Sequence, residues 1–144
     1  MHASTGIPID QSVYVGCALT HAPQQFKDDI VAFKAGIRRY IHVLEFVGPT
    51  AGTPKDVYKT DIRYAEEALL FVAVCDIPSI GLGMEIQARF HAKRPLLLLA
   101  RDFSQVTRIV SGGAEVHAGI TVTGTYKDLP TEGPRIVQEV LSIL

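Results

Sequence analysis

The chain has 144 residues, 47% of them apolar, which is enough to bury the core of one domain. Its 14 basic and 15 acidic side chains nearly cancel, which disfavours a nucleic-acid partner because such proteins usually present a basic face. The two cysteines are too few for a disulfide framework, and the five histidines show no zinc-ligand spacing with them, so we expect no metal. The N-terminus does not resemble a signal peptide and no apolar run could span a membrane, so we expect a cytoplasmic protein with no membrane partner.

The first part of the chain alternates strand-like and helix-like segments. Ser12–Gly16 is a short β-branched and aromatic run, which predicts a strand. From Pro23 to Tyr40 apolar residues recur at helical spacing, which predicts a helix. Ile41–Val47 alternates and is rich in β-formers, so we expect a second strand there, followed by a helix from about Pro54 to Ala68.

The second part continues the same alternation. Leu69–Val74 and Pro95–Ala100 are continuous apolar runs, typical of parallel strands that are covered on both sides. A helix is predicted between them, at Met84–Lys93. The remaining expected elements are a short helix at Gln105–Ser111, a strand at Gly119–Val122 and a helix at Pro134–Leu144.

This order predicts the fold class and the place of a ligand. We expect a single-domain, doubly wound α/β fold, Rossmann-like or flavodoxin-like, with a five-stranded parallel sheet and helices on both faces. The domain is predicted to span residues 12–144, after a disordered or loosely attached tail at residues 1–11. Because ligands of such sheets bind outside the carboxyl ends of the strands, the loops after the strands should carry the functional residues.

The sharpest local feature is the turn Ser79-Ile80-Gly81-Leu82-Gly83-Met84-Glu85, which follows a buried strand and opens a helix. Ser79 offers a hydroxyl group, and Gly81 and Gly83 let backbone N–H groups approach an anion at the positive end of the helix. The turn is therefore a candidate phosphate site. Helix-entry turns without a ligand often use the same residues.

Two carboxylates are candidates for chemistry at this place. Glu85, in the first turns of the helix, could attack the anomeric carbon of a sugar as an ionised nucleophile. Asp61, on the preceding helix, could hold a proton beside it, as acid–nucleophile pairs require. The alternatives are an exposed Glu85–Arg89 pair at i, i+4 and a solvated charge at Asp61.

These residues together resemble a known family. Asp61–Pro95 contains an aspartate on a helix, an apolar strand, a serine-glycine-glycine-glutamate turn and a helix that ends in Arg-Pro. This pattern resembles the nucleoside 2-deoxyribosyltransferase-like family, and Val13–Cys17 is similar to the family's first strand, which carries a tyrosine. The resemblance extends from about Val13 to Gly112, and the separation of Asp61 from Glu85 fits it.

The resemblance implies roles for individual residues and no cofactor. Glu85 would form a glycosyl–enzyme intermediate, Asp61 would protonate or orient the leaving base, and Tyr14 would hold Glu85 or the sugar. Ser79 and Gly81 would bind the 5′ end of the nucleotide. Thr107, five residues before Gly112, is similar to a hydroxyl residue that the nucleoside 5′-monophosphate N-hydrolase branch places on the phosphate from a neighbouring subunit. This implies a homodimer or a dimer of dimers.

Several positions depart from the family pattern, and alternatives stay open. Ala68-Leu69 stands where the family often has an aspartate, and Gln87 stands where it often has a glycine. After the first strand, this chain has Cys17-Ala18-Leu19-Thr20 where the hydrolase branch has a serine and an arginine. We expect cleavage of a ribo- or deoxynucleoside 5′-monophosphate, with a small-molecule substrate whose base is undetermined. Base exchange between nucleosides by a deoxyribosyltransferase and a non-catalytic nucleotide sensor are the alternatives. Gly16-Cys17-Ala18-Leu19 does not match a dinucleotide-binding turn.

Overall fold

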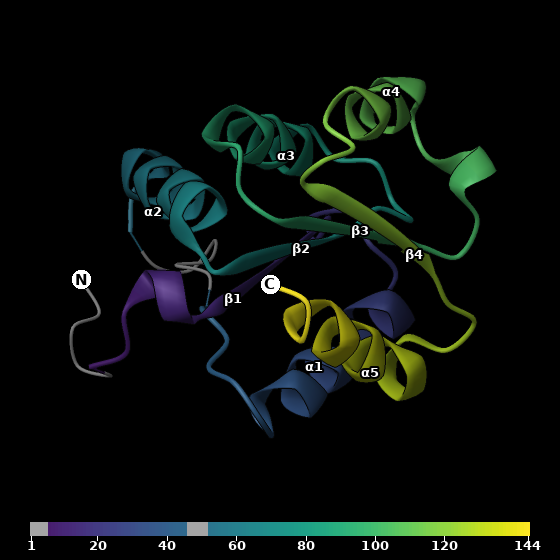
Figure 1. The fold of residues 1–144 in the computed structure, drawn as a ribbon, viewed down its shortest axis with the longest axis horizontal. Helices are drawn as coiled ribbons and strands as arrows, with labels where there is room; N and C mark the ends of the chain where they lie inside the picture. The colour runs from purple at the N-terminus through teal and green to yellow at the C-terminus, as the bar shows by residue number, and fades with distance from the viewer. Residues whose placement is uncertain (1–5, 46–51) are drawn as a thin grey trace.

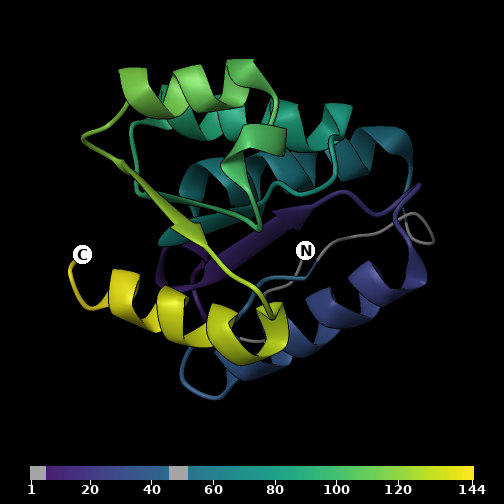
Figure 2. The ribbon, with the colours of Figure 1, turned by 90° about the vertical axis from the view of Figure 1, so that its right-hand side faces the viewer.

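The computed structural model describes residues 6–45 and 52–144, and within them four parallel strands form one sheet. Figures 1 and 2 show this sheet between two layers of helices. Its strands lie side by side in chain order, β1 (Val13–Cys17), β2 (Leu70–Val74), β3 (Leu96–Ala100) and β4 (Thr121–Thr125). Every pairing is parallel, with Val13 opposite Leu70 and Leu96 opposite Thr121.

Helices cover both faces of the sheet, which confirms the predicted α/β architecture (Figure 1). One face carries α1 (Gln24–Arg38) and α5 (Leu129–Leu141), which pack on each other. The other face carries α2 (Pro54–Glu67), α3 (Ile80–Ala92) and α4 (Arg108–Val116). Short 3-10 turns occur at Ile9–Gln11 and Phe103–Gln105.

The fifth strand predicted at Ile41–Val47 is wrong for the residues that the structure describes. Only Val43 pairs there, in a single parallel bridge to Val13 on the outer side of β1. Val43 and Leu44 are buried on opposite faces of the sheet. The alternating sequence pattern of this segment therefore reflects burial of its side chains, and not a strand with several backbone pairs. Phe46 and Val47, the end of the predicted strand, lie outside the described residues.

Helix boundaries differ from the predictions for local reasons. The third helix starts at Ile80 and not at Met84, because Ser79 caps it. The last helix starts at Leu129 and not at Pro134, with Pro130 in its first turn, where proline is tolerated. The helix expected at Gln105–Ser111 is displaced to α4 and continues through Gly112 and Gly113.

The alternation of side chains along β1 decides which residues can face a site. Val13, Val15 and Cys17 belong to the core between the sheet and α1–α5. Tyr14 points to the opposite face and joins the core beneath α2 and α3. Gly16, two residues further along the strand, lies on the same face as Tyr14. On the face beneath α2 and α3, β1 therefore carries the phenol of Tyr14 and, at Gly16, a position without a side chain.

A buried arginine fixes α3 at its carboxyl-terminal end. The Arg89 side chain is fully buried, and its guanidinium group donates to the carbonyl oxygens of Ala65, Glu66, Leu69 and Pro95 at 2.7–3.3 Å. These carbonyls come from α2, from the start of β2 and from the start of β3. Burial lowers the pKa of Arg89 to about 9, so the group remains charged at neutral pH. Arg89 thus joins α3 to three neighbouring segments.

Arg89→Met should destabilise the fold, because four carbonyls would lose the hydrogen bonds that the guanidinium group donates, where little water can replace them. We expect the free energy of unfolding, measured by urea denaturation, to fall by about 3 kcal/mol or more. Arg63→Met is the control, because Arg63 forms an exposed i, i+4 pair with Glu67, and its loss should cost less than about 1 kcal/mol. Equal losses in the two variants would contradict this role of Arg89.

Candidate active site

The candidate site lies where the chain changes direction across the sheet. After β1 the chain forms the bridge at Val43 on the outer side of β1, then returns to form β2 on the inner side. The carboxyl ends of β1 and β2 therefore flank the topological switch point, where doubly wound sheets bind ligands. Gly16 and Cys17 end β1 there, and five residues separate the end of β2 from the start of α3.

Glu85 lies over the end of β1 and is held by a tyrosine. Its side chain is 8% exposed, and the fully buried Tyr14 hydroxyl donates to its Oε2 at 2.6 Å. The other oxygen lies against Gly16, where a Cβ atom would come within 3.0 Å of Oε1. The Tyr14 ring in turn stacks on Phe71, with ring centroids 5.2 Å apart. The Tyr14 hydroxyl and the absence of a side chain at Gly16 therefore set the orientation of the Glu85 carboxylate.

The exposed Glu85–Arg89 pair considered from the sequence does not form. Both side chains are buried, and Arg89 donates its hydrogen bonds to backbone carbonyls near the carboxyl-terminal end of α3. Burying a carboxylate is costly unless a donor compensates it, and here Tyr14 is the donor. Such an arrangement is more typical of a functional carboxylate than of a surface charge.

Asp61 approaches the same place from α2. Its Oδ1 atom is buried and has no hydrogen-bond partner among the described residues. Burial raises the pKa of Asp61 to about 6, against the opposite effect of Lys34. In addition to burial, the negative charge of Asp61 raises the pKa of both Glu85 and Tyr14, so Asp61 lies within electrostatic reach of their hydrogen bond. Asp61 is therefore not the solvated surface charge that was the alternative interpretation.

The two carboxylates titrate close to neutral pH. Burial raises the pKa of Glu85 to about 7, the Tyr14 hydrogen bond lowers it, and the charge of Asp61 raises it further. Burial, together with both carboxylates, also keeps the pKa of Tyr14 well above its ordinary value, so the phenol remains a donor. Near neutral pH the pair can thus hold one proton, which the higher pKa of Glu85 places on Glu85 in the free protein.

The turn before Glu85 forms a helix N-terminus with a serine cap. Ser79 Oγ accepts from the Leu82 N–H at 3.3 Å, and Gly83 N–H donates to the Ser79 carbonyl at 3.1 Å. The Gly83 N–H is therefore used within the helix, contrary to its expected role toward an anion. Ile80 and Gly81 occupy the first helical positions, whose N–H groups have no acceptor within a helix.

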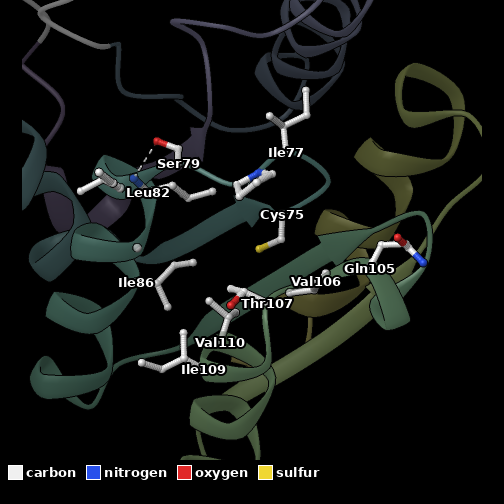
Figure 3. Close-up of a pocket in the computed structure, with 13 residues that line it drawn as sticks. Cys75, Ile77, Ser79, Leu82, Ile86, Gln105, Val106, Thr107, Ile109 and Val110 are labelled. Carbon is white, nitrogen blue, oxygen red and sulfur yellow. Dashed lines mark hydrogen bonds between the residues drawn. The ribbon is translucent and has the colours of Figure 1, made fainter.

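Ser79 and Thr107 of the same chain line one pocket, shown in Figure 3. The pocket has a volume of about 390 Å³ and lies between α3 and α4. Its walls are mainly apolar, and Gln105 adds an amide. Thr107 precedes α4, and its side chain makes no cap hydrogen bond. Gly83 lines this pocket but Glu85 does not, because Glu85 leaves α3 on the side toward β1.

Two site residues were not predicted from the sequence. Gly16 was noted only as the end of a strand, yet a side chain there would strike Glu85 and Phe71. Lys34 was not considered, although it is only 7% exposed and interacts electrostatically with Asp61. Its signal was a lysine placed among Ile30, Phe33 and Ile37, within the apolar stripe of α1.

Two other features are absent from the residues that the structure describes. Across residues 6–45 and 52–144, no three histidine, cysteine or acidic side chains gather closely enough to hold a metal ion. No helix in this part of the chain combines the length and the hydropathy needed to cross a membrane.

No protein-family model matches the chain, but one curated protein shares a segment with it. The relative is named "Putative 2'-deoxynucleoside 5'-phosphate N-hydrolase 1", from Thermofilum pendens, and is 42% identical over 48 residues. The shared segment covers 33% of this chain and 34% of that relative. The chain thus matches about a third of the length of this curated relative.

Two solved structures share the fold. The structure of Clostridium botulinum CMP N-glycosidase has a TM-score of 0.66 at 17% sequence identity, over 90% of this chain and 98% of that one. A 2-desoxiribosyltransferase from Leishmania mexicana has a TM-score of 0.55 at 13% identity, over 64% of this chain and 65% of that one. Together with the shared segment, these similarities confirm the resemblance to the nucleoside 2-deoxyribosyltransferase-like family.

Gly16→Ala should disrupt the Glu85 site from the strand side. The new Cβ would lie 2.6 Å from Phe71 Cε1 and 3.0 Å from Glu85 Oε1, so the ring, the carboxylate or both must move. We expect the free energy of unfolding to fall by about 1–3 kcal/mol, and a crystal structure of the variant to show the Tyr14–Glu85 hydrogen bond broken or lengthened. Gly112→Ala is the control, because a Cβ there meets nothing within 4 Å. An unchanged Glu85 in the Gly16 variant would contradict this prediction.

Proposed function

We propose that the protein cleaves the N-glycosidic bond of a ribo- or deoxynucleoside 5′-monophosphate and releases free base and sugar phosphate. The observation that carries this proposal is the buried Glu85 carboxylate, which accepts a hydrogen bond from the Tyr14 hydroxyl at 2.6 Å and whose pKa is raised by burial and by the charge of Asp61. The names of the Thermofilum and Clostridium proteins, a nucleotide N-hydrolase and a CMP N-glycosidase, support the choice of reaction and of a phosphorylated substrate.

In the first step Glu85 attacks the anomeric carbon of the sugar. A carboxylate oxygen forms the new C–O bond, and the electrons of the breaking C–N bond pass to the nitrogen of the base. Asp61 gives its proton to the base and becomes a carboxylate. Glu85 must be ionised for this step, and the Tyr14 hydrogen bond favours that form against the effect of burial.

In the second step water attacks the same carbon of the glycosyl–glutamate intermediate. Asp61, now a carboxylate, can accept a proton from that water, which restores both residues to their starting forms. The sugar phosphate is released with Glu85 ionised again. In the free protein the pKa is about 6 for Asp61 and about 7 for Glu85. Because these values are close, a modest shift of either pKa on substrate binding moves the shared proton from Glu85 to Asp61.

The substrate phosphate is assigned to the beginning of α3. The Ser79 hydroxyl can still donate, since its cap interaction uses it as an acceptor, and the N–H groups of Ile80 and Gly81 point out of the helix end. Thr107 faces the same pocket within its own chain. A homodimer or dimer of dimers, in which Thr107 also serves a neighbouring site, remains a prediction that light scattering can test.

A deoxyribosyltransferase would use the same glutamate but would let a second base, not water, attack the intermediate. Incubating the enzyme with a deoxynucleotide, with and without added base, separates the two reactions, because sugar phosphate alone indicates hydrolysis. A non-catalytic nucleotide sensor would bind nucleotide without turnover.

Glu85→Gln should abolish base release while keeping the fold, because the amide preserves the size of the side chain but cannot act as the nucleophile. We expect kcat to fall by at least about three orders of magnitude, measured as free base released from a panel of nucleosides and 5′-monophosphates. Glu115→Gln on the exposed face of α4 is the matched control and should retain full activity. Near wild-type turnover by Glu85→Gln would exclude the proposed mechanism.

Thr107→Ala and Ser79→Ala should each raise KM for 5′-monophosphates by about tenfold or more, with little effect on the corresponding nucleosides. Ser79→Ala also removes the cap of α3, which costs about 1 kcal/mol of stability. Thr53→Ala removes the comparable cap of α2 and is the control for this effect. If KM rises equally for 5′-monophosphates and nucleosides, or if unphosphorylated nucleosides are the better substrates, the phosphate assignment is wrong.

A further inference from the structure

One carboxylate joins the two loops that line the pocket between α3 and α4. The loop after β2 brings Ser79 to this pocket, and the loop after β3 brings Thr107 (Figure 3). Asp76 lies within the first loop, and its Oδ1 atom accepts the backbone N–H of Arg101, the first residue of the second loop, at 2.7 Å. A single side chain therefore connects the loop that carries Ser79 to the loop that carries Thr107.

Asp76 belongs to a row of three side chains that crosses the carboxyl edge of the sheet. The register of the last pairs of β2, β3 and β4 places Asp76 beside Arg101 and Arg101 beside Tyr126. The Tyr126 hydroxyl donates to Oδ2 of Asp76, so each oxygen of the carboxylate accepts one hydrogen bond. Tyr126 is buried directly after the end of β4, which makes its hydroxyl a fixed donor to the loop after β2.

Arg101 is held in this row by its side chain as well as by its backbone. Its guanidinium carbon lies 5.2 Å from the centroid of the Tyr126 ring, and the guanidinium group donates to the Lys127 carbonyl. Asp76, Arg101 and Tyr126 thus contact one another in pairs, and each pair joins the ends of two different strands. Either loop can move away from the other only if one of these contacts breaks.

Local hydrogen bonds fix the course of the loop from Arg101 toward Thr107. Asp102 Oδ1 accepts from the Ser104 N–H at 2.9 Å and from the Ser104 hydroxyl at 2.8 Å. These bonds cap the 3-10 turn Phe103–Gln105, which ends two residues before Thr107. The position of Arg101 therefore determines where the Thr107 hydroxyl lies.

We propose that Asp76 is a positioning residue for the substrate phosphate, because it fixes the loop that carries Ser79 relative to the loop that carries Thr107. This inference rests on the proposed function, which assigns the phosphate to the pocket that both hydroxyl groups line. One phosphate can accept from both hydroxyls only if their separation matches its oxygens, and a displacement of about 1 Å is enough to lose a hydrogen bond. Loss of Asp76 should therefore weaken binding of the phosphate and spare the chemical step.

The binding test uses calorimetry in the Glu85→Gln background, which blocks turnover, with a deoxynucleoside 5′-monophosphate and the corresponding nucleoside as ligands. Asp76→Ala removes both acceptors and should weaken binding of the monophosphate by about tenfold, while the affinity for the nucleoside changes by less than about twofold. Asp76→Asn should restore most of the lost affinity. Its amide oxygen can accept the Arg101 N–H, and its amide nitrogen can donate to the Tyr126 oxygen.

A matched pair of tyrosine variants separates positioning from a general loss of stability. Tyr126→Phe removes one of the two donors to Asp76 and should weaken binding of the monophosphate by about threefold. Tyr40→Phe is the control, because the Tyr40 hydroxyl donates to the Pro134 carbonyl between α1 and α5, on the face of the sheet opposite the pocket. This control should leave both affinities unchanged.

A double-variant cycle tests whether Asp76 acts through Thr107. In Thr107→Ala protein, Asp76→Ala should weaken binding of the monophosphate by about twofold or less, because the loop that Asp76 positions no longer supplies a donor. A tenfold loss in both backgrounds, or equal losses for the nucleoside and the monophosphate, would overturn the proposal. Full affinity for the monophosphate in folded Asp76→Ala protein would do the same.

If Asp76→Ala does not fold, Tyr126→Phe decides the question, and an unchanged affinity for the monophosphate in that variant would overturn the proposal. A monophosphate that binds no more tightly than its nucleoside in Glu85→Gln protein would also overturn it. Failure of base release by the wild-type protein would refute the proposed function, whereas the binding results would still decide the role of Asp76.

Discussion

The buried Glu85 carboxylate is the constraint on which the rest of the site depends. A carboxylate removed from water needs a donor, and the Tyr14 hydroxyl supplies one at 2.6 Å. Tyr14 is itself held by stacking on Phe71 and by an edge contact with Tyr64, at 5.2 and 5.6 Å between ring centroids. The carboxylate can approach β1 only because position 16 has no side chain. Two adjacent strands and one helix of the neighbouring layer therefore determine where the reactive oxygen lies.

The placement of α3 connects this carboxylate to the pocket on its other side. Ser79 caps the helix at one end, and Arg89 holds the other end through carbonyls of α2, β2 and β3. With both ends fixed, the side of α3 that carries Glu85 faces β1, whereas Gly83 and Ile86 face α4. The proposed reaction uses both sides of this helix, with bond cleavage on the β1 side and phosphate recognition at its N-terminus.

Much of this arrangement could be predicted from the sequence, because continuous apolar runs and helical periodicity report burial directly. The parallel sheet and the contribution of Tyr14, Asp61 and Glu85 to one end of it followed from that pattern and from the family resemblance. The strand at Ile41–Val47 did not, because alternating burial does not require more than one bridge. Gly16 could not be assigned either, since its role depends on the approach of Phe71 from the neighbouring strand and of Glu85 from α3, which has no local signature.

The central claim, that Glu85 becomes covalently attached to the sugar, can be tested by trapping the intermediate. The protein is incubated with a 2′-fluorinated deoxynucleoside 5′-monophosphate, which slows hydrolysis of the glycosyl ester, then quenched in acid and digested. Mass spectrometry should find the added mass of the fluorinated sugar phosphate on the peptide that contains Glu85, and not in Glu85→Gln protein. Burst release of base without any adduct, or an adduct on another residue, would contradict the account.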